Sequence, residues 1–477
     1  MNALTRDLIK LVDIAEKDQK TREERSADDR KFREKLHLMP PVGWLNDPNG
    51  LCQFQGIYHA FFQYSPFDAE GGVKMWGHYI SKNMIDWEYQ GTALYPNQPF
   101  DCHGVYSGSA FIEDGKMYLY YTGNVKLEDG EYDYIRNGRE GNTVLVVSKD
   151  GKTFGQKKEL MRNTDYPADL TCHVRDPKVW KEQDTYYMVQ GARTKEDVGQ
   201  VLVFESKDKI NWKFRNRVES EEPFGYMWEC PDYFEVGVKK ILSASVQGLE
   251  GGVWDDRNVY QSGYFEVDGD ILGDYKLSEY HLWDYGFDYY APQSFETEDG
   301  RRIHISWMGM PDCEEYTNPT IQTGWQHCFT FPREIFEKDG KICQRPVREL
   351  EEKKTLISSV EGMLEGNGYP VYELNISDIS QNQFHVTLSE ELILDYEGGK
   401  FRMYFTDQDK KAVSAGRSMR YVETTEVKNL KILADTSSVE VFVNDGEYVF
   451  STRYYPEEYK VKAEAKGAGI ALYNVIE

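Results

Sequence analysis

Residues 46–64 read NDPNGLCQFQGIYHAFFQY, and the plan of this stretch recurs along the first two thirds of the chain. It opens with a polar and an acidic residue beside Pro48, runs as a short strand to a turn at Gly56, and returns as a strand rich in aromatic residues. Aromatic side chains pack well on pleated surfaces, and Gly is typical of the turn. The stretch therefore predicts an antiparallel hairpin with a polar opening.

Four more segments share this plan, and the starts of successive segments lie about 54 to 68 residues apart. They begin at Ser107 (SGSAFIEDGKMYLYYTG), Arg175 (RDPKVWKEQDTYYMVQGA), Glu229 (ECPDYFEVGVKKILSASVQ) and Ala291 (APQSFETEDGRRIHISWMG). Roughly sixty residues accommodate four strands with loops, and five such units arranged radially form a β-propeller. A stack of unrelated hairpins would not explain the shared phase. We predict an all-β chain with a five-bladed propeller.

The inner strands of a propeller converge on one axis, so residues that open equivalent strands meet at one end of the ring. Asp47, Asp176 and Glu229 stand at three such openings. Although about 180 residues separate the first from the last, we expect their side chains to face one another across a funnel.

Converging carboxyl groups suit the cleavage of a glycosidic bond. Retention requires one carboxylate to attack the anomeric carbon and a second carboxyl group, ~5–5.5 Å away, to protonate the leaving oxygen. A third carboxylate stabilises the cationic transition state. Crowding of like charges raises pKa values, which helps a glutamic acid to stay protonated near neutral pH. Composition alone leaves the three roles open.

An ordered set of motifs makes the chain recognisable. It comprises WLNDPNG at 44–50, FQY at 62–64, WGH at 76–78, YSGS at 106–109, RDP at 175–177 and ECP at 229–231. The set closely resembles glycoside hydrolase family 32, the invertase, sucrose-6-phosphate hydrolase and fructan hydrolase group. The likeness is strong over about residues 36–336 and weaker in the tail.

The resemblance implies Asp47 as nucleophile, Asp176 as transition-state stabiliser and Glu229 as acid/base. It further implies a set of substrate-binding residues, for whose tryptophans packing between blades is an equally good explanation: Trp44, Asn46, Gln63, Trp76, Tyr106, Ser107, Arg175, Asp288 and Trp307.

The rest of the chain divides by pattern. Residues 1–35 predict an amphipathic helical extension that packs outside the propeller or mediates self-association. Residues 36–336 are expected to form the catalytic propeller. The charged stretch 337–355 predicts a linker, and 356–477 a β-sandwich of short alternating strands with a hairpin at Asn444-Asp445-Gly446.

Composition limits the partners. The net charge is −25, with no basic run, which disfavours nucleic acids and anionic membranes and leaves a small carbohydrate as the expected partner. Seven scattered cysteines and the absence of an apolar signal segment favour the cytoplasm. No metal or cofactor motif is present, and a possible homo-oligomer stays open.

Two other functions share these features. A fructosyltransferase would use the same covalent intermediate, and a sugar-binding protein without catalysis would share the cavity. Sucrose, sucrose 6-phosphate and short fructooligosaccharides are all expected substrates of a hydrolase. A phosphate on the glucosyl unit would need basic residues at the rim, for which Arg136, Arg139, Arg193 and Lys195 are the candidates.

Overall fold

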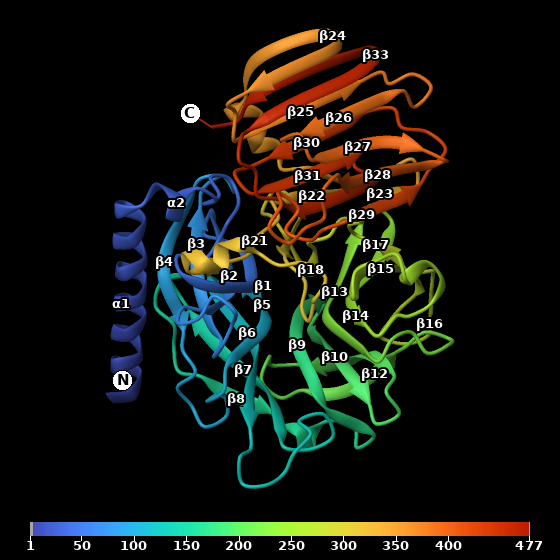
Figure 1. The fold of residues 1–477 in the computed structure, drawn as a ribbon. Coiled ribbons are helices and arrows are strands. Elements are labelled where there is room, and N and C mark those ends of the chain that lie inside the picture. The colour runs from blue at the N-terminus through green and yellow to red at the C-terminus, as the bar shows by residue number, and fades with distance from the viewer. Residues whose placement is uncertain (1–2, 477) are drawn as a thin grey trace.

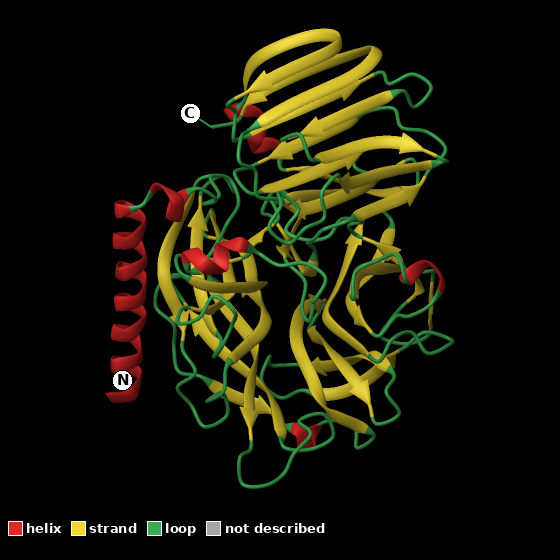
Figure 2. Ribbon diagram, in the orientation of Figure 1, coloured by secondary structure: helices red, strands yellow, loops and turns green. Residues whose placement is uncertain are grey.

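The computed structural model describes residues 3–476, and its regular secondary structure consists mainly of β-strands (Figure 2). Five sheets lie around a central axis, and a sixth, larger sheet lies at one side of the ring (Figure 1). The structure thus confirms the predicted five-bladed propeller followed by a sandwich-like domain.

Within each blade the consecutive strands pair antiparallel, and the first of them lies innermost. The first blade contains β1 (Gly43–Phe54), β2 (Ile57–Ser65), β3 (Met75–Ser81) and β4 (Trp87–Leu94). The second contains β5 (Val105–Glu113), β6 (Lys116–Lys126), β7 (Arg139–Ser148) and β8 (Lys158–Met161). The third contains β9 (Leu170–Glu182), β10 (Thr185–Thr194), β11 (Gly199–Ser206) and β12 (Lys213–Val218).

The last two blades carry short additional strands. The fourth contains β13 (Met227–Val236), β14 (Lys239–Gln247), β15 (Tyr260–Gly269), β16 (Tyr275–Leu277) and β17 (His281–Leu282). The fifth contains β18 (Tyr290–Glu296), β19 (Arg302–Met308), β21 (Cys328–Phe329), β22 (Arg333–Lys338) and β23 (Lys341–Pro346). Residues 337–346, expected in a linker, instead belong to the outer hairpin β22–β23 of this blade, with Ile342 and Cys343 buried and the charged side chains exposed.

The ring is closed by a short parallel pairing. After β19 the chain crosses to the first blade, where β20 (Trp325–Gln326) pairs with Gly43 and Trp44 at the start of β1. Separate apolar clusters fill the spaces between blades; one joins Phe54, Phe61 and Trp76 of the first blade to Leu119 and Val146 of the second. Aromatic side chains of the inner strands are thus buried between the blades.

The C-terminal domain is one ten-stranded sheet folded into two layers. Its long strand β33 (Lys460–Asn474) pairs with β26 through its first half and with β25 through its second, and with β24 along its other edge. The other strands are β24 (Thr355–Asn367), β25 (Tyr372–Ser377), β26 (Phe384–Leu388), β27 (Leu392–Glu397), β28 (Lys400–Phe405), β29 (Met419–Glu423), β30 (Leu430–Ala434), β31 (Ser438–Val443) and β32 (Tyr448–Arg453). The turn at residues 444–446 joins β31 to β32, as expected.

Helices are few. The helix α1 (Ala3–Arg25) runs along the outside of the first blade beside β4, and α2 (Ala27–Arg30) follows it (Figure 1). The Glu16 carboxylate accepts hydrogen bonds from the Tyr64 and Tyr89 hydroxyls, at 3.0 and 2.7 Å. Within residues 3–476 no helix is long and apolar enough to span a bilayer.

The buried face of α1 differs from the expected one. The sequence predicts an apolar stripe of Leu4, Leu8, Leu11, Val12 and Ala15. Val12 is buried together with Thr5 and Gln19, whereas Leu4 and Leu11 are exposed. Val12 belongs to a buried apolar cluster against which Leu8 also packs, and polar contacts such as Gln19 Nε2 to Thr323 O at 2.9 Å hold the rest of this face. A role of this extension in self-association stays a prediction.

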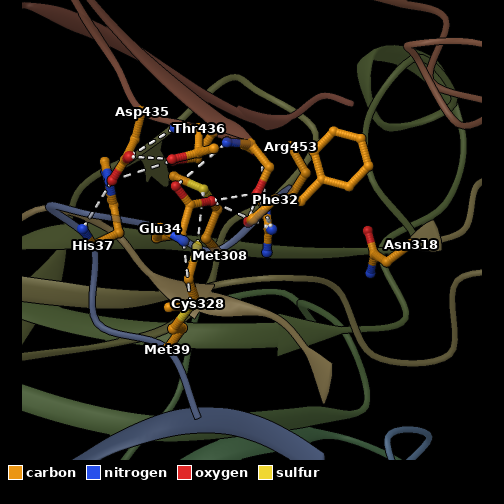
Figure 3. Close-up of polar contacts among 12 residues, drawn as sticks. Phe32, Glu34, His37, Met39, Met308, Asn318, Cys328, Asp435, Thr436 and Arg453 are labelled. Atoms are coloured by element: carbon orange, nitrogen blue, oxygen red, sulfur yellow. Dashed lines mark hydrogen bonds and ion pairs between the residues drawn. The ribbon is translucent and has the colours of Figure 1, made fainter. Parts of the chain in front are cut away.

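A buried ionic cluster fastens the start of the propeller chain to the sandwich (Figure 3). The His37 ring lies between two carboxylates, with Nδ1 2.9 Å from Asp435 and Nε2 2.9 Å from Glu440. Arg453 approaches Glu34 at 3.4 Å in the same cluster. Because both ring nitrogens of His37 bond carboxylates, neither is free to bind a metal, although Glu34, His37 and Asp435 lie close enough together to suggest a metal site.

Candidate active site

Breaks in the β-ladders aim the site residues at the propeller axis. Each innermost strand loses its register with the next strand where its motif lies, and such bulges redirect side chains that a regular strand would point into the sheet packing. The breaks fall between Leu45 and Pro48, between Val105 and Gly108, opposite Val189–Gly191, between Glu229 and Asp232, and between Tyr290 and Gln293. A feature repeated in all five blades therefore builds the site.

Three of these bulges hold a residue other than glycine in the left-handed region. The φ angles are +65° at Asp176, +47° at Cys230 and +51° at Ala291. Such conformations cost free energy and persist only where the surrounding structure enforces them, which is typical of functional sites.

Asp47 is held by neutral donors. Asn46 Nδ2 donates to Oδ1 at 3.1 Å, and the Ser107 hydroxyl donates to Oδ2. Gln63 Nε2 donates to Ser107 at 3.1 Å, and Trp44 Nε1 donates to the Asn46 amide oxygen at 2.7 Å, so both partners of Asp47 are themselves oriented. Burial raises the pKa of Asp47, and the Glu229 charge adds to the rise.

Asp176 lies beside the other two carboxyl groups. Its Oδ2 accepts a hydrogen bond from the Cys230 backbone N–H at 2.9 Å and lies 4.0 Å from Arg175 Nε. Burial, together with the Glu229 charge, raises the pKa of Asp176 to about 7 despite the opposing effect of Arg175. Cys230 also places its Sγ 3.7 Å from Asp47 Oδ2, so a single residue links two of the carboxylates.

Both oxygens of Glu229 are occupied by donors. Arg175 donates to Oε1 from Nε at 3.0 Å and from Nη2 at 2.6 Å. Gln247 Nε2 at 2.8 Å and the Tyr290 hydroxyl at 2.6 Å donate to Oε2. This set of donors fixes the direction in which the carboxyl group faces the cavity.

The three carboxyl groups line one cavity of about 290 Å³. Most of the expected binding residues line it too, namely Trp44, Asn46, Gln63, Tyr106, Ser107, Arg175 and Trp307. The structure thereby brings together side chains from all five blades.

Two expected residues do not line this cavity. Trp76 is fully buried behind it, and its Nε1 donates to the Tyr106 carbonyl at 3.1 Å, which gives it a packing role. Asp288 is also fully buried, and its two oxygens accept hydrogen bonds from Arg417 of the sandwich, both at 2.7 Å. Asp288 therefore joins the two domains and has no oxygen that faces the carboxylate cluster.

The cavity also contains residues that motif reasoning did not select: Lys74, Arg139, Gln247, Tyr290, Pro311 and Asp312. Tyr290 adjoins a motif and Arg139 is a rim candidate, so both carried a signal. Lys74, Gln247 and Asp312 lie at strand ends or in loops, and only the ring geometry brings them to the rim.

A larger cavity of about 780 Å³ lies between the fifth blade and the sandwich. Its charged side chains are neutralised in pairs; Lys338 contacts Asp445 at 2.6 Å, and Lys431 contacts Glu351 at 3.5 Å. It holds no converging carboxyl groups, so the smaller axial cavity is the candidate active site.

A five-bladed propeller with carboxyl groups gathered at its axis, joined to a β-sandwich, defines a class of glycosidases. Sequence comparison makes this class specific. Residues 37–346 match the model of the glycosyl hydrolases family 32 N-terminal domain, and residues 372–475 match the family 32 C-terminal model. The chain belongs to glycoside hydrolase family 32, and it is a glycosidase.

Individual relatives agree along nearly the whole chain. A sucrose-6-phosphate hydrolase of Bacillus subtilis is 37% identical over 457 residues, covering 93% of each chain. A raffinose invertase of Escherichia coli is 38% identical over 444 residues, covering 88% of this chain and 89% of the relative.

Solved structures share the fold. The sucrose-6-phosphate hydrolase of Lactobacillus gasseri superimposes with a TM-score of 0.87 at 27% identity, covering 97% of this chain and 96% of the other. A mutant Bombyx mori GH32 β-fructofuranosidase in complex with sucrose superimposes with a TM-score of 0.80 at 29% identity, covering 97% and 98%.

Proposed function

We propose that the protein hydrolyses terminal non-reducing β-D-fructofuranosyl residues of sucrose, sucrose 6-phosphate or short fructooligosaccharides, with retention of configuration. The observation that carries this proposal is the gathering of Asp47, Asp176 and Glu229 around one small cavity with amide, hydroxyl and guanidinium donors. The names of the relatives supply the substrate class.

The reaction proceeds by double displacement. In the first step an Asp47 oxygen attacks the anomeric carbon, the glycosidic C–O bond breaks, and Glu229 gives its proton to the leaving oxygen. In the second step Glu229 takes a proton from water, the oxygen of that water attacks the same carbon, and Asp47 is released with free fructose. Asp176 stabilises the positive charge that develops on the ring in both steps.

Contacts in the site support this division of roles. Asp47 is held by neutral donors, which leave its carboxylate nucleophilic. Glu229 lies where Arg175, Gln247 and Tyr290 orient it across the cavity. The seven cysteines are all free, which supports the inferred cytoplasmic location.

The test is the hydrolysis of sucrose by the intact protein and by Asp47→Asn. We expect equal release of glucose and fructose, the first-formed fructose to retain its β configuration by NMR, and less than about 1% of the activity in the variant. Excess glucose over fructose would instead favour fructosyl transfer. Residual Asp47→Asn activity above a few per cent would remove Asp47 from the role of nucleophile.

A further inference from the structure

The catalytic cavity holds a fourth carboxyl group that the proposed mechanism does not use. Among the described residues that line the cavity, Asp312 is the one acidic residue besides Asp47, Asp176 and Glu229. Asp312 is exposed, whereas Asp176 is buried and the other two are partly buried. This fourth carboxyl group therefore lies at the mouth of the cavity, outside the three carboxyl groups of the mechanism.

A chain of hydrogen bonds holds the Asp312 carboxylate. The Tyr260 hydroxyl donates to Oδ2 at 3.0 Å, and the Tyr226 hydroxyl donates to the Tyr260 oxygen at 3.1 Å. Burial raises the pKa of Tyr260, and the contacts with Tyr226 and Asp312 add to the rise, so this hydroxyl keeps its proton. Each bond in such a chain polarises the next and strengthens it. Within residues 3–476 no donor is paired with Oδ1, which is left to meet a ligand.

The loop that carries Asp312 follows β19 and is fixed by the sandwich. Asp312 has a φ angle of +55°, in the left-handed region that aspartate adopts more readily than most residues. From the sandwich, Lys410 Nζ donates to the Glu314 carbonyl at 2.7 Å, and the Ala415 carbonyl accepts from Thr317 N at 3.0 Å. Tyr260 of the fourth blade holds the carboxylate itself. The fourth carboxyl group is thus presented to the cavity by a loop that both domains hold.

Two contacts place Tyr260 and Asp312 on the side of the cavity where Glu229 lies. Tyr260 of β15 is directly opposite Gln247 of β14 in the ladder, and Gln247 donates to Glu229 Oε2. The Tyr260 ring also packs against the Tyr290 ring, with 6.1 Å between centroids, and the Tyr290 hydroxyl donates to the same oxygen of Glu229. Under the proposed function Glu229 gives its proton to the leaving oxygen, so the leaving group departs along this side.

The fourth carboxyl group has no ion-pair partner in the described part of the chain. Of the basic residues expected at the rim, Arg139 lines the catalytic cavity. Arg136 and Arg193 instead bond Asp197, at 3.1 and 2.8 Å, and Lys195 donates to a backbone carbonyl at 2.7 Å; none of these three lines the cavity. An ionised carboxylate only accepts hydrogen bonds, so a ligand has to offer N–H or O–H groups to it.

We propose that Asp312 is a specificity-determining residue whose carboxylate accepts hydrogen bonds from hydroxyl groups of the leaving-group sugar, and that Tyr260 positions it. Bonds from hydroxyl groups to an ionised acceptor are shorter and stronger than bonds between neutral groups. They form only when the leaving group is a sugar, so they favour fructosides of sugars over fructosides of simple alcohols. The inference rests on the proposed function for the side on which the leaving group departs.

The test compares two substrates that share the fructosyl ring and differ in the leaving group. Sucrose releases glucose, which carries several hydroxyl groups, whereas methyl β-D-fructofuranoside releases methanol, which has no further hydroxyl. We expect Asp312→Ala to lower kcat/KM for sucrose about 10- to 100-fold, and that for the methyl fructoside less than about threefold. Asp312→Asn, which keeps an acceptor for Tyr260, should give a smaller fall with the same preference. Circular dichroism checks the fold of each variant.

A double-mutant cycle tests the positioning role of Tyr260. Tyr260→Phe should lower kcat/KM for sucrose about 3- to 10-fold, and should cause little further loss in the Asp312→Ala background. Glu314→Ala is the matched control. Glu314 is an exposed acidic residue of the same loop, and it lines a neighbouring cavity of about 400 Å³ and not the catalytic one. This control should change kcat/KM for either substrate less than about twofold.

The outcomes separate this inference from the proposed function. Equal falls for the two substrates in Asp312→Ala, or no fall for sucrose, would overturn the inference, while hydrolysis of both by the intact protein would uphold the proposed function. A comparable loss in Glu314→Ala would also overturn it, because the effect would then be one of general charge. Fully additive losses in the cycle would overturn the role of Tyr260. If the intact protein hydrolysed neither substrate, the proposed function would fail and the inference with it.

Discussion

Arg175 places two hydrogen bonds on a single oxygen of Glu229, from Nε at 3.0 Å and Nη2 at 2.6 Å. Its remaining Nη1 contacts His173, and its Nε lies 4.0 Å from Asp176. One planar guanidinium thus orients Glu229 and places positive charge beside Asp176. A lysine provides the charge at that position without the planar fork.

Arg175→Lys should therefore lower kcat/KM for sucrose by about 100-fold or more, although it conserves the charge. Steady-state kinetics on sucrose measures the loss, and circular dichroism checks the fold. Arg217→Lys is the matched control, because Arg217 forms a comparable two-bond pair with Asp169 at the surface. Equal kinetics for the two variants would contradict the orienting role.

The acidic limb of the pH profile should lie well above pH 4. Burial raises the pKa of Asp176 to about 7 and also raises that of Asp47. Both groups need to be ionised in their proposed roles, so kcat/KM should fall as the pH drops through about 7. The limb belongs to the coupled cluster and not to one residue. A profile that stays flat down to pH 4.5 would show that the cluster is ionised throughout.

The ion pair between Asp288 and Arg417 should be important for stability. Both side chains are fully buried, and Arg417→Met leaves the Asp288 carboxylate without its partner. We expect the free energy of unfolding to fall by about 3–5 kcal/mol, measured by urea denaturation. Lys428→Met, which removes an exposed pair with Glu426, should leave that free energy nearly unchanged. Similar effects of the two variants would contradict a joining role for Asp288.

The His37 cluster should make stability depend on alkaline pH. Burial alone would lower the pKa of His37, but the hydrogen bonds and charges of Asp435 and Glu440 outweigh it and raise the pKa to about 10. The folded-state pKa exceeds the unfolded value of about 6.5, so this contribution is fully present below pH 6.5 and is lost as the pH rises toward 10.

Thermal unfolding between pH 6.5 and 10 measures this dependence. His37→Gln should be less stable at pH 6.5 and should lose less stability on the way to pH 10. His281→Gln, at an exposed position, should keep the slope of the intact protein. A parallel decline in all three proteins would contradict the role of His37.

Repetition explains why so much was predictable from the sequence. The phase of five hairpins places Asp47, Asp176 and Glu229 on one axis, and this argument needs no knowledge of loops. Trp76 was expected in the cavity wall, because an indole within a motif gives the same sequence signal whether it lines a cavity or packs behind it. Asp288 was expected to bind substrate, because the sequence carries no local signal of its partner Arg417, which lies 129 residues away in another domain. Lys74 and Gln247 stand outside any motif, and only their positions in the ring reveal them.

The closure of the ring by β20 has a consequence for biosynthesis. His327, next to this strand, contacts the Leu45 carbonyl across 282 residues of chain. At about 5–20 residues per second, a ribosome needs roughly 15–60 s between making the two partners. During that interval the edge of the first blade has no neighbour to cover it, so the nascent chain is most exposed to aggregation and to chaperones before the last blade emerges.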